Sequence, residues 1–249
     1  MLDGTTTTTR VNAVDFNAFL EGWLVRQEHY LDELLTAEQN SHVSRDEDLR
    51  ELVARVLSHY QQYYEEKSRI ARSDTFLVFS PPWFTPLEKS FFWVAGFKPQ
   101  LAFRVLTDSV SDLISDQQAR VDRLKAETRV DERMVADKLA KIQESVGDPP
   151  VSEAAKARGR WVLDGRYGEA TVGLEEEGAV MEMVRSKLEA VVGSADLLRR
   201  NTVAKVVEIL SPVQNVRLLT AVGQLQLRVR GLGLEFDARK GETCGSSSP

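Results

Sequence analysis

The residue types that most often carry chemistry are scarce in this sequence and badly spaced for it. The three histidines, His29, His42 and His59, form neither a His-x-x-x-His nor a His-Glu-x-x-His pair, which would place two metal ligands on one helical turn. The one cysteine, Cys244, lies in a Gly/Ser-rich tail, where no base or buried environment is expected to activate its thiol. We therefore expect no metal site, and we interpret each imidazole as a surface or satisfied interfacial side chain.

Loops that activate a serine or bind phosphate are also missing. No Gly-x-Ser-x-Gly elbow occurs, and Gly165, Gly168 and Gly173 lack the Gly-Lys-Ser/Thr ending of a phosphate-binding loop. Gly231 and Gly233 follow an expected helix rather than a strand, so they do not open a dinucleotide-binding turn. The sequence therefore predicts a protein that is not an enzyme, with no catalytic residue and no cofactor.

Composition and charge narrow the class of protein. The 249 residues are 42% hydrophobic and 28% charged, which is close to the globular average and excludes a wholly disordered or collagen-like chain. The net charge of −6 argues against non-specific binding of the whole chain to nucleic acid. The longest apolar run, residues 91–97, is far shorter than the roughly 20 residues that span a bilayer, so we expect no membrane partner. These features predict a soluble protein of the nucleus and cytoplasm.

The elements that must position any site are predicted to be helices. Apolar residues recur three and four positions apart through most of the chain, which predicts an all-α bundle of about seven helices. Long helices are expected over three stretches: from about residue 16 to 35, from a Ser44–Glu47 capping box to near Asp74, and from Ser115 to Val146. Later helices are expected to break at Gly193-Ser194 and at Ser211-Pro212.

The same pattern predicts one folded domain with three less regular segments. We expect a single helical domain over residues 14–236, preceded by a disordered, threonine-rich segment over residues 1–13. Residues 148–173 contain several glycines and little periodicity, which predicts a mobile linker or insertion. Residues 237–249 are expected to form a disordered Gly/Ser tail.

The densest local pattern is the segment 80–99, which holds two Trp, four Phe and four Pro. Within it, Thr85-Pro86-Leu87-Glu88 predicts a capping box at the start of a short helix that carries Phe91, Phe92 and Trp93, and Pro99 is expected to start the next helix. Two interpretations remain open. The segment either forms a rigid corner between long helices or lines a groove for a partner peptide or an apolar ligand.

This segment closely resembles the motif of the plant Delay of Germination (DOG) family, whose domain is shared with the C-terminal regulatory part of TGA bZIP transcription factors. The match spans residues 16–232, and the residues expected to be structural or to bind a partner are Trp23, Tyr60, Lys67, Asp74, Trp83, Pro86, Glu88, Trp93, Gly96, Phe97 and Pro99. Two further matching stretches are Ala195–Arg199 and Ile209–Gln214. The resemblance implies the helical fold that the periodicity predicts independently.

The resemblance also implies a function. It points to a non-enzymatic regulatory adaptor of the DOG type, acting in seed dormancy and maturation and in transcriptional regulation through protein contacts, with type 2C protein phosphatases of abscisic-acid signalling as partners. The alternative is a TGA-like transcription regulator or ligand sensor that reaches DNA through bZIP partners. Only about fifteen residues, five of them threonines, precede the first expected helix, so we expect no direct bZIP-type contact with DNA.

The resemblance raises the question of haem. In the dormancy branch of the family, haem binding is associated with two histidines four residues apart in the last helix. Gln226 and Arg230 occupy these positions here, and neither is a competent axial ligand. We therefore expect no haem binding by this route.

A basic stretch near the C-terminus is a candidate docking face. Between Leu197 and Arg230 there is one acidic residue, Glu208, and there are six basic residues: Arg199, Arg200, Lys205, Arg217, Arg228 and Arg230. Such a face suits an acidic partner or calmodulin, although a solvated face balanced by the glutamates at 175–177 is the plainer interpretation. Separately, the charged helix expected from Ser115 to Val146 is a candidate for pairing in a homodimer.

Overall fold

The computed structural model describes residues 3–149, 151 and 171–245 of the chain, and no β-strand occurs among them. The elements are α1 (Asp3–Gln39), α2 (Asp46–Ser73), α3 (Thr75–Phe79), α4 (Pro86–Ser90), α5 (Gln100–Ser109), α6 (Ser115–Glu144), the 3₁₀ turn η1 (Ser145–Gly147), α8 (Thr171–Ile209) and α9 (Pro212–Gly245). The prediction of an all-α, multi-helix bundle is confirmed.

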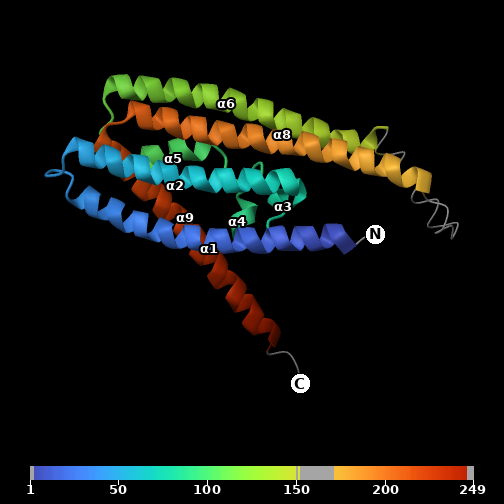
Figure 1. Ribbon diagram of the computed structural model, residues 1–249. Helices are drawn as coiled ribbons and strands as arrows, with labels where there is room; N and C mark the ends of the chain where they lie inside the picture. Colours follow the sequence, from blue (N-terminus) through green and yellow to red (C-terminus); the bar gives the residue numbers. More distant parts are fainter. Residues whose placement is uncertain (1–2, 150, 152–170, 246–249) are drawn as a thin grey trace.

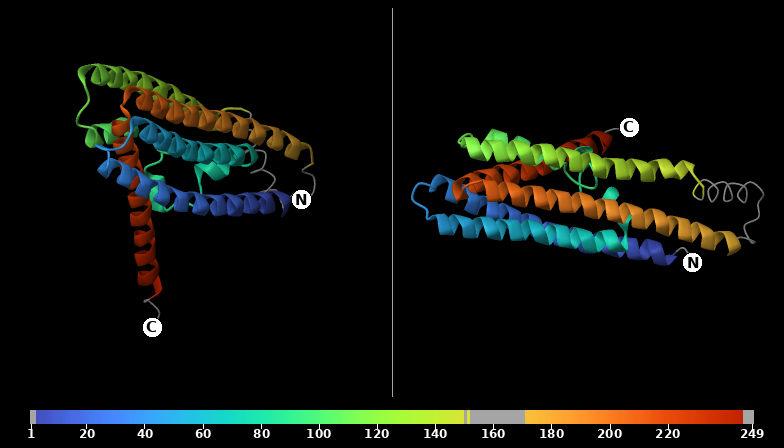
Figure 2. Two further views of the ribbon diagram at one scale, coloured as in Figure 1. Left: turned by 60° about the vertical axis from the view of Figure 1, so that its left-hand side comes forward. Right: turned by 90° about the horizontal axis from the view of Figure 1, so that it is seen from above.

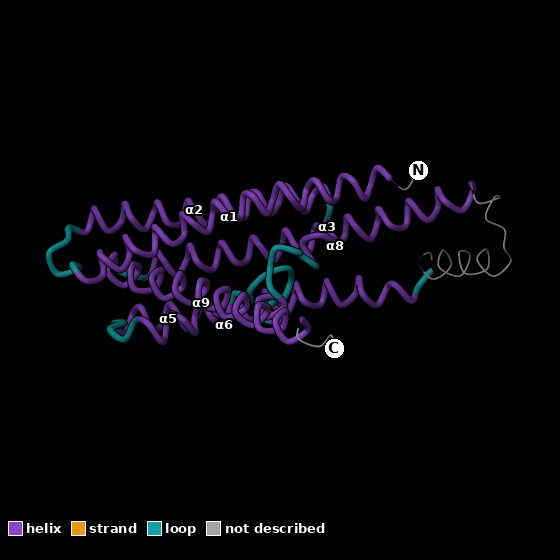
Figure 3. Tube along the Cα trace, turned by 90° about the horizontal axis from the view of Figure 1, so that it is seen from below, coloured by secondary structure: helices purple, strands orange, loops and turns teal. Residues whose placement is uncertain are grey.

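Two antiparallel helix pairs set the shape of the bundle. α1 pairs with α2, and α6 pairs with α8 (Figure 1). α9 crosses this arrangement at a steep angle, contacts α1, α2, α4 and α5, and then projects beyond the bundle to the C-terminus (Figure 2). The non-helical chain around α4 lies near the middle of the bundle's length rather than at one end (Figure 3). The segment that the sequence singles out is therefore surrounded by the long helices.

The boundaries of α2 are set by local polar groups. The predicted Ser44 capping box does not form, because the Ser44 hydroxyl donates to the Asn40 carbonyl at 3.0 Å and Arg45 becomes the N-cap without a side-chain bond. Three acidic residues, Asp46–Asp48, instead interact favourably with the positive end of the helix dipole. α2 ends at Ser73, as predicted, because Asp74 adopts an extended backbone and its carboxylate accepts the Leu77 amide, which caps α3.

The structure differs from the sequence prediction at the two ends of the chain. α1 begins at Asp3, within the segment 1–13 that was expected to be disordered, and α9 continues to Gly245, beyond the expected boundary at residue 236. Threonine costs a helix only a few tenths of a kcal/mol, and no proline interrupts either stretch, so neither contains a strong stop signal. Most of the predicted linker 148–173 lies outside the described residues, and α8 begins at Thr171.

Of the two breaks predicted late in the chain, one is confirmed and one is wrong. α8 ends at Ile209 and α9 begins at Pro212, as Ser211-Pro212 predicts. At Gly193, however, α8 continues without interruption. One glycine in a helix interior costs about 1 kcal/mol, which the packing of neighbouring Val192 and Ala195, both buried, can offset.

The core nearest the segment 80–99 is aromatic. Trp23 of α1 is 1% exposed, and Phe16 packs on Trp83 with 4.3 Å between ring centroids. Ile70 of α2 and Val192 of α8 belong to the same cluster. Three long helices thus meet under Trp83, and burial of one such ring contributes about 2 to 3 kcal/mol.

Candidate functional site

The short helix α4 is held by the capping box that the sequence predicts. The Thr85 hydroxyl accepts the Glu88 amide at 3.2 Å, and the Glu88 carboxylate accepts the Thr85 amide at 2.7 Å. Pro86 occupies the first turn. Glu88 is buried, and its second oxygen lies 3.5 Å from the Arg230 guanidinium on α9. Arg230 also donates to the Trp83 carbonyl at 3.3 Å, so α9 is fastened to this segment by polar contacts.

α4 ends at Ser90, so Phe91, Phe92 and Trp93 lie in the following turn and not on the helix as predicted. Residues 91–99 form what we call the corner loop. Ala95 has a φ of 49°, in the left-handed region, and the Trp93 amide donates to the Gly96 carbonyl at 2.8 Å across the turn. This sharp turn frees the Val94 and Phe97 carbonyls from helical bonding. Pro99 is the N-cap of α5, as expected from its place before that helix.

Arg199 of α8 bonds the freed carbonyls. Its Nε donates to the Phe97 carbonyl and one Nη to the Val94 carbonyl, each at 2.6 Å. Its other Nη donates to the Asp196 carboxylate one turn earlier on α8. The planar guanidinium thereby clamps the corner loop to α8 with three fixed donors, which a lysine could not reproduce.

The corner loop approaches Arg199 closely because residue 96 is glycine. A Cβ at Gly96 would lie 3.1 Å from the guanidinium carbon of Arg199, closer than ordinary van der Waals contact. The Trp93 ring lies on another side, with its centroid 5.7 Å from the same carbon. Gly96, Phe97 and Trp93, three residues that carry the family resemblance, therefore all surround one buried guanidinium.

Lys67 of α2 joins this arrangement from the opposite side. Its ammonium lies 2.8 Å from the Asp196 carboxylate oxygen that also accepts from Arg199. We call Lys67, Asp196 and Arg199 the charged cluster; all three are buried. Burial lowers the pKa of Lys67 to about 8, while the Asp196 carboxylate pulls it upward and Arg199 adds to the lowering. The cluster links α2, α8 and the corner loop, so its charges are used inside the fold.

A second buried group lies between α1, α2 and α9. The Trp23 indole donates to the His59 carbonyl at 2.9 Å, the Gln27 amide donates to the Tyr60 hydroxyl at 2.8 Å, and Tyr60 donates to Gln226 at 3.2 Å. We call these five residues the polar cluster. The His59 ring stacks on Trp23 with 4.3 Å between centroids. Gln226, one of the two positions considered for haem, is thus held in a side-chain contact, as is Arg230.

Three phenylalanines of the segment 80–99 contact one another through their rings. Phe84, Phe92 and Phe97 are half-buried and meet edge to face, with centroid distances of 5.2 and 5.6 Å. Phe91, beside them in the chain, is 54% exposed. We call these four residues the aromatic strip. Of the two interpretations left open by the sequence, the bonds of the corner loop to Arg199 support the rigid corner, and the exposed ring of Phe91 leaves an apolar surface for a partner.

The six basic residues of the candidate docking face differ in their exposure and in their partners. Arg199 is buried in the charged cluster, whereas Arg200 and Arg228 are exposed. The other three approach carboxylates: Lys205 at 4.0 Å from Glu127, Arg217 at 3.0 Å from Asp112 and Arg230 at 3.5 Å from Glu88. The count along the sequence gives this stretch a net positive charge. The carboxylate partners come from segments distant in the sequence, so much of that positive charge is neutralised in the folded protein.

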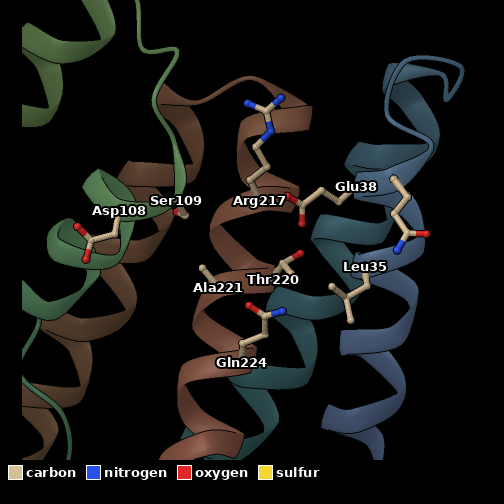
Figure 4. Close-up of a pocket in the computed structure, with 9 residues that line it drawn as sticks. Leu35, Glu38, Asp108, Ser109, Arg217, Thr220, Ala221 and Gln224 are labelled. Carbon is tan, nitrogen blue, oxygen red and sulfur yellow. The ribbon is translucent and has the colours of Figure 1, made fainter.

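One open cleft of about 560 Å³ lies between α1, α5 and α9 (Figure 4). Its lining is polar and includes Glu38, Asp108, Thr220 and Gln224. The Thr220 hydroxyl donates to a backbone carbonyl, and none of the described residues that line the cleft is a histidine or a cysteine, so they do not pair a nucleophile with a base. Within the described residues, no group of three His, Cys, Asp or Glu side chains is arranged to hold a metal ion. None of the described helices is long and apolar enough to cross a membrane.

Sequence reasoning missed the joint role of Asp196 and Arg199. It placed Arg199 on a docking face and Asp196 only in a matching stretch. One sequence feature could have revealed this role: Asp196 and Arg199 are three residues apart and lie between the buried residues Val192 and Val206. A charged pair on the apolar side of a helix needs partners inside the fold. Lys67, a single lysine on the buried side of α2, gives the same signal.

Comparison with known proteins gives a consistent set of relatives. A family model, DOG1, described as seed dormancy control, matches residues 30–108, which include α2 and the corner loop. The protein RESPONSE TO ABA AND SALT 1 of Arabidopsis thaliana is 41% identical over 86% of this chain and 93% of its own length. Protein ZW2 of the same plant is 37% identical over 88% of this chain and 96% of its own length.

Transcription factors form a more distant group of relatives. The TGACG-sequence-specific DNA-binding protein TGA-2.1 of Nicotiana tabacum is 28% identical over 91% of this chain but only 48% of its own length. This chain therefore corresponds to about half of that protein and to nearly the whole of the two Arabidopsis relatives.

Proposed function

The chain belongs to the DOG1 seed dormancy control family of plant proteins, and from this premise we propose that it is a regulator that acts by binding other proteins rather than by catalysing a reaction. We propose the nucleus and cytoplasm as its place of action. The similarity to an Arabidopsis protein named RESPONSE TO ABA AND SALT 1 supports a role in abscisic-acid signalling.

The use of the polar residues supports a non-catalytic role. Lys67 and Arg199 both donate to Asp196, Arg199 also donates to the corner loop, and Glu88 bonds Thr85 and Arg230. A catalytic acid, base or nucleophile must reach a bound substrate, whereas these polar groups bond other parts of the fold and hold the helices together. A partner would therefore bind residues on the surface of the protein and not these buried polar groups.

The observation that carries the proposal is the aromatic strip. Phe91 is 54% exposed although it lies on a loop whose neighbouring carbonyls are clamped by Arg199. A rigid loop that presents an aromatic ring loses little conformational entropy on binding, and aromatic residues are enriched among the residues that dominate interface energies. We propose that the strip binds a protein partner, and that type 2C protein phosphatases are the partner class.

The test compares two exposed phenylalanines. Phe91→Ser removes the most exposed ring of the strip, and Phe76→Ser removes a ring on α3 that is 42% exposed and lies outside the strip. Binding of each purified full-length variant to purified type 2C phosphatases is measured by calorimetry. Phe91→Ser is expected to weaken binding at least about tenfold, corresponding to about 1.4 kcal/mol, and Phe76→Ser to leave it unchanged.

Wild-type affinity in the Phe91→Ser variant would remove the strip from the proposal. A wild-type protein that binds no type 2C phosphatase would remove the partner class. Thermal unfolding of both variants serves as the control, since neither ring is buried.

A second candidate is a TGA-like regulator that joins bZIP factors at promoters. Similarity to TGA proteins over about nine-tenths of this chain supports it. Mixing the protein with DNA that carries a TGACG element separates the two candidates. Tight, steeply salt-dependent binding to this DNA without any partner favours the TGA-like regulator. Binding only in the presence of a bZIP factor favours a TGA-like regulator that reaches DNA through that factor.

A further inference from the structure

In the open cleft between α1, α5 and α9, residues near the C-terminal ends of α1 and α5 face each other across α9 (Figure 4). Leu35 and Glu38 come from α1, and Asp108 comes from α5. The volume of about 560 Å³ falls within the range of about 300 to 1,000 Å³ that is typical of small-ligand sites. The cleft is therefore large enough for a small organic molecule.

Hydrogen-bond acceptors outnumber free donors in this cleft. The Ser109 hydroxyl donates to the Val105 carbonyl at 2.8 Å, and the Thr220 hydroxyl donates to the Val216 carbonyl at 2.9 Å. Each hydroxyl has thereby used its only hydrogen and offers a ligand only oxygen lone pairs. Thr220 is 3% exposed, and its hydroxyl points into the cleft toward the Glu38 carboxylate (Figure 4). A group that binds here must therefore supply the hydrogens.

The charges that line the cleft are neutralised to different degrees. The Arg217 guanidinium lies 3.0 Å from the Asp112 carboxylate, so this cation already has a partner. Asp108 lies 3.5 Å from Arg104, but both side chains are largely exposed, so this ion pair is weak. Within the described residues, the Glu38 carboxylate has neither a hydrogen bond nor an ion pair. Glu38 is therefore the negative charge that a ligand can engage most directly.

The helix ends add to the negative potential of the cleft. α1 ends at Gln39 and α5 ends at Ser109, and neither helix has a basic residue in its last turn. The C-terminal end of a helix carries a partial negative charge, which favours a nearby cation. Glu38 and Asp108 add charges of the same sign at these two ends. Both sides of the cleft therefore favour a positively charged ligand.

We propose that the cleft binds a linear polyamine, a molecule whose ammonium groups are joined by short aliphatic chains. One ammonium group donates to the Glu38 carboxylate and to the Thr220 hydroxyl. The aliphatic chain lies along Leu35 and Ala221, and a second ammonium group approaches Asp108 at the edge of the cleft. An ammonium group has three donors and no acceptor, which suits a cleft that offers mainly acceptors. This inference stands independently of the proposed function.

Calorimetric titration of the full chain with spermidine at low salt tests the proposal. The wild type is expected to bind one equivalent with a dissociation constant in the micromolar range. Glu38→Gln keeps the shape of the side chain and removes its charge, so it should weaken binding at least about tenfold. Asp108→Asn should weaken binding only about threefold, because this carboxylate is exposed and already shared with Arg104.

A matched control is available on the same helix. Glu28 is an exposed residue of α1 that does not line the cleft, so Glu28→Gln removes the same charge and should bind spermidine like the wild type. Neither Glu28 nor Glu38 is buried, and thermal unfolding confirms that both variants are folded. Equal weakening in Glu28→Gln and Glu38→Gln would indicate diffuse attraction to a chain of net charge −6 and would overturn the proposal.

Competing cations test the class of ligand. Magnesium ions lack N–H donors, so at equal ionic strength they should weaken spermidine binding no more than sodium ions do. Stronger displacement by magnesium than by sodium would show that the cleft recognises charge alone and would contradict the proposal. A wild type that binds no spermidine would overturn it, and binding of a tetralysine peptide in its place, lost in Glu38→Gln, would assign the cleft to a basic segment of a partner protein.

Discussion

The charged cluster and the polar cluster are both buried between long helices, yet they are satisfied to different degrees. None of the charged side-chain atoms of Lys67, Asp196 and Arg199 is among the buried atoms that lack a hydrogen-bond partner in the described residues. In the polar cluster, both ring nitrogens of His59 and the Gln27 carbonyl oxygen are buried without one. An unpaired buried charge costs several kcal/mol, whereas an unpaired neutral group costs about 1 to 3 kcal/mol.

This difference separates two kinds of constraint. The charged cluster joins α2, α8 and the corner loop, because Lys67 and Arg199 share the Asp196 carboxylate and Arg199 also bonds the loop carbonyls. These bonds fix the position of the loop. The polar cluster relies more on ring stacking, in which Trp23 meets His59 and Tyr60, and it tolerates unmet hydrogen bonds. We therefore expect changes in the charged cluster to be costly and changes in the polar cluster to depend on pH.

The largest effect is expected from removing the shared carboxylate. Asp196→Ala leaves two buried cations without a counter-ion and should lower the free energy of unfolding by about 3 to 5 kcal/mol. Asp112→Ala removes a carboxylate from the more exposed Arg217 pair and should cost at most about 1 kcal/mol. Urea denaturation of both variants measures the difference. Equal losses would show that the charged cluster is no more important than a surface pair.

The polar cluster is expected to make stability depend on mildly acidic pH. Burial, with a smaller contribution from the charge of Arg26, lowers the pKa of His59 from 6.5 to about 4. The unfolded chain therefore takes up a proton first, so this contribution is complete above about pH 6.5 and is lost as the pH falls toward 4. Compared with His59→Phe, which keeps a ring but cannot titrate, the wild type should lose about 2 kcal/mol more between about pH 7 and about pH 5.

Urea titrations at the two pH values give this difference directly. Other groups that titrate in the same range are common to both proteins and cancel. Parallel losses in the wild type and in His59→Phe would show that the imidazole is not held neutral in the fold.

Two glycines sharpen the comparison with smaller effects. A Cβ at Gly96 would lie 3.1 Å from the Arg199 guanidinium, and one at Gly223 would lie 3.2 Å from the Gln27 amide nitrogen. Arg199 is fixed by three bonds, so Gly96→Ala should cost about 1 to 3 kcal/mol. Within the described residues, the Gln27 amide nitrogen makes one hydrogen bond, to the Tyr60 hydroxyl, where Arg199 makes three, and alanine favours the α9 helix by about 1 kcal/mol, so Gly223→Ala should be nearly neutral. A larger loss for Gly223→Ala, measured by thermal unfolding, would reverse the comparison.

Much of the fold follows from local sequence. Apolar spacing predicts α6 almost to the residue, and Thr85 with Glu88 and the Ser211-Pro212 break behave as their types predict. Local patterns fail where two local outcomes differ by about 1 kcal/mol or less, as at Gly193, where packing favours a continuous helix. They also fail at Ser44, whose hydroxyl bonds backward to Asn40 instead of capping α2.

The candidate site was harder to predict because its partners are distant in sequence. Arg199 looks like a surface cation in a basic stretch, yet its acceptors lie about a hundred residues earlier, at Val94 and Phe97. Periodicity locates the buried side of α8 but does not show which carbonyls meet it. Gly96 signals in the sequence that a helix can end here, but nothing local shows that Ala95 takes the left-handed conformation that exposes these carbonyls.

The central claim is that Arg199 holds the corner loop in place and does not serve a docking face. Hydrogen exchange of the segment 91–99, followed in full-length Arg199→Lys and Arg200→Lys, tests it most directly, because both variants keep the charge and only the first loses the guanidinium bonds to Val94 and Phe97. The account predicts exchange at least about tenfold faster in this segment for Arg199→Lys, and wild-type exchange for Arg200→Lys, whose side chain is exposed. Wild-type exchange of the segment in Arg199→Lys would contradict it.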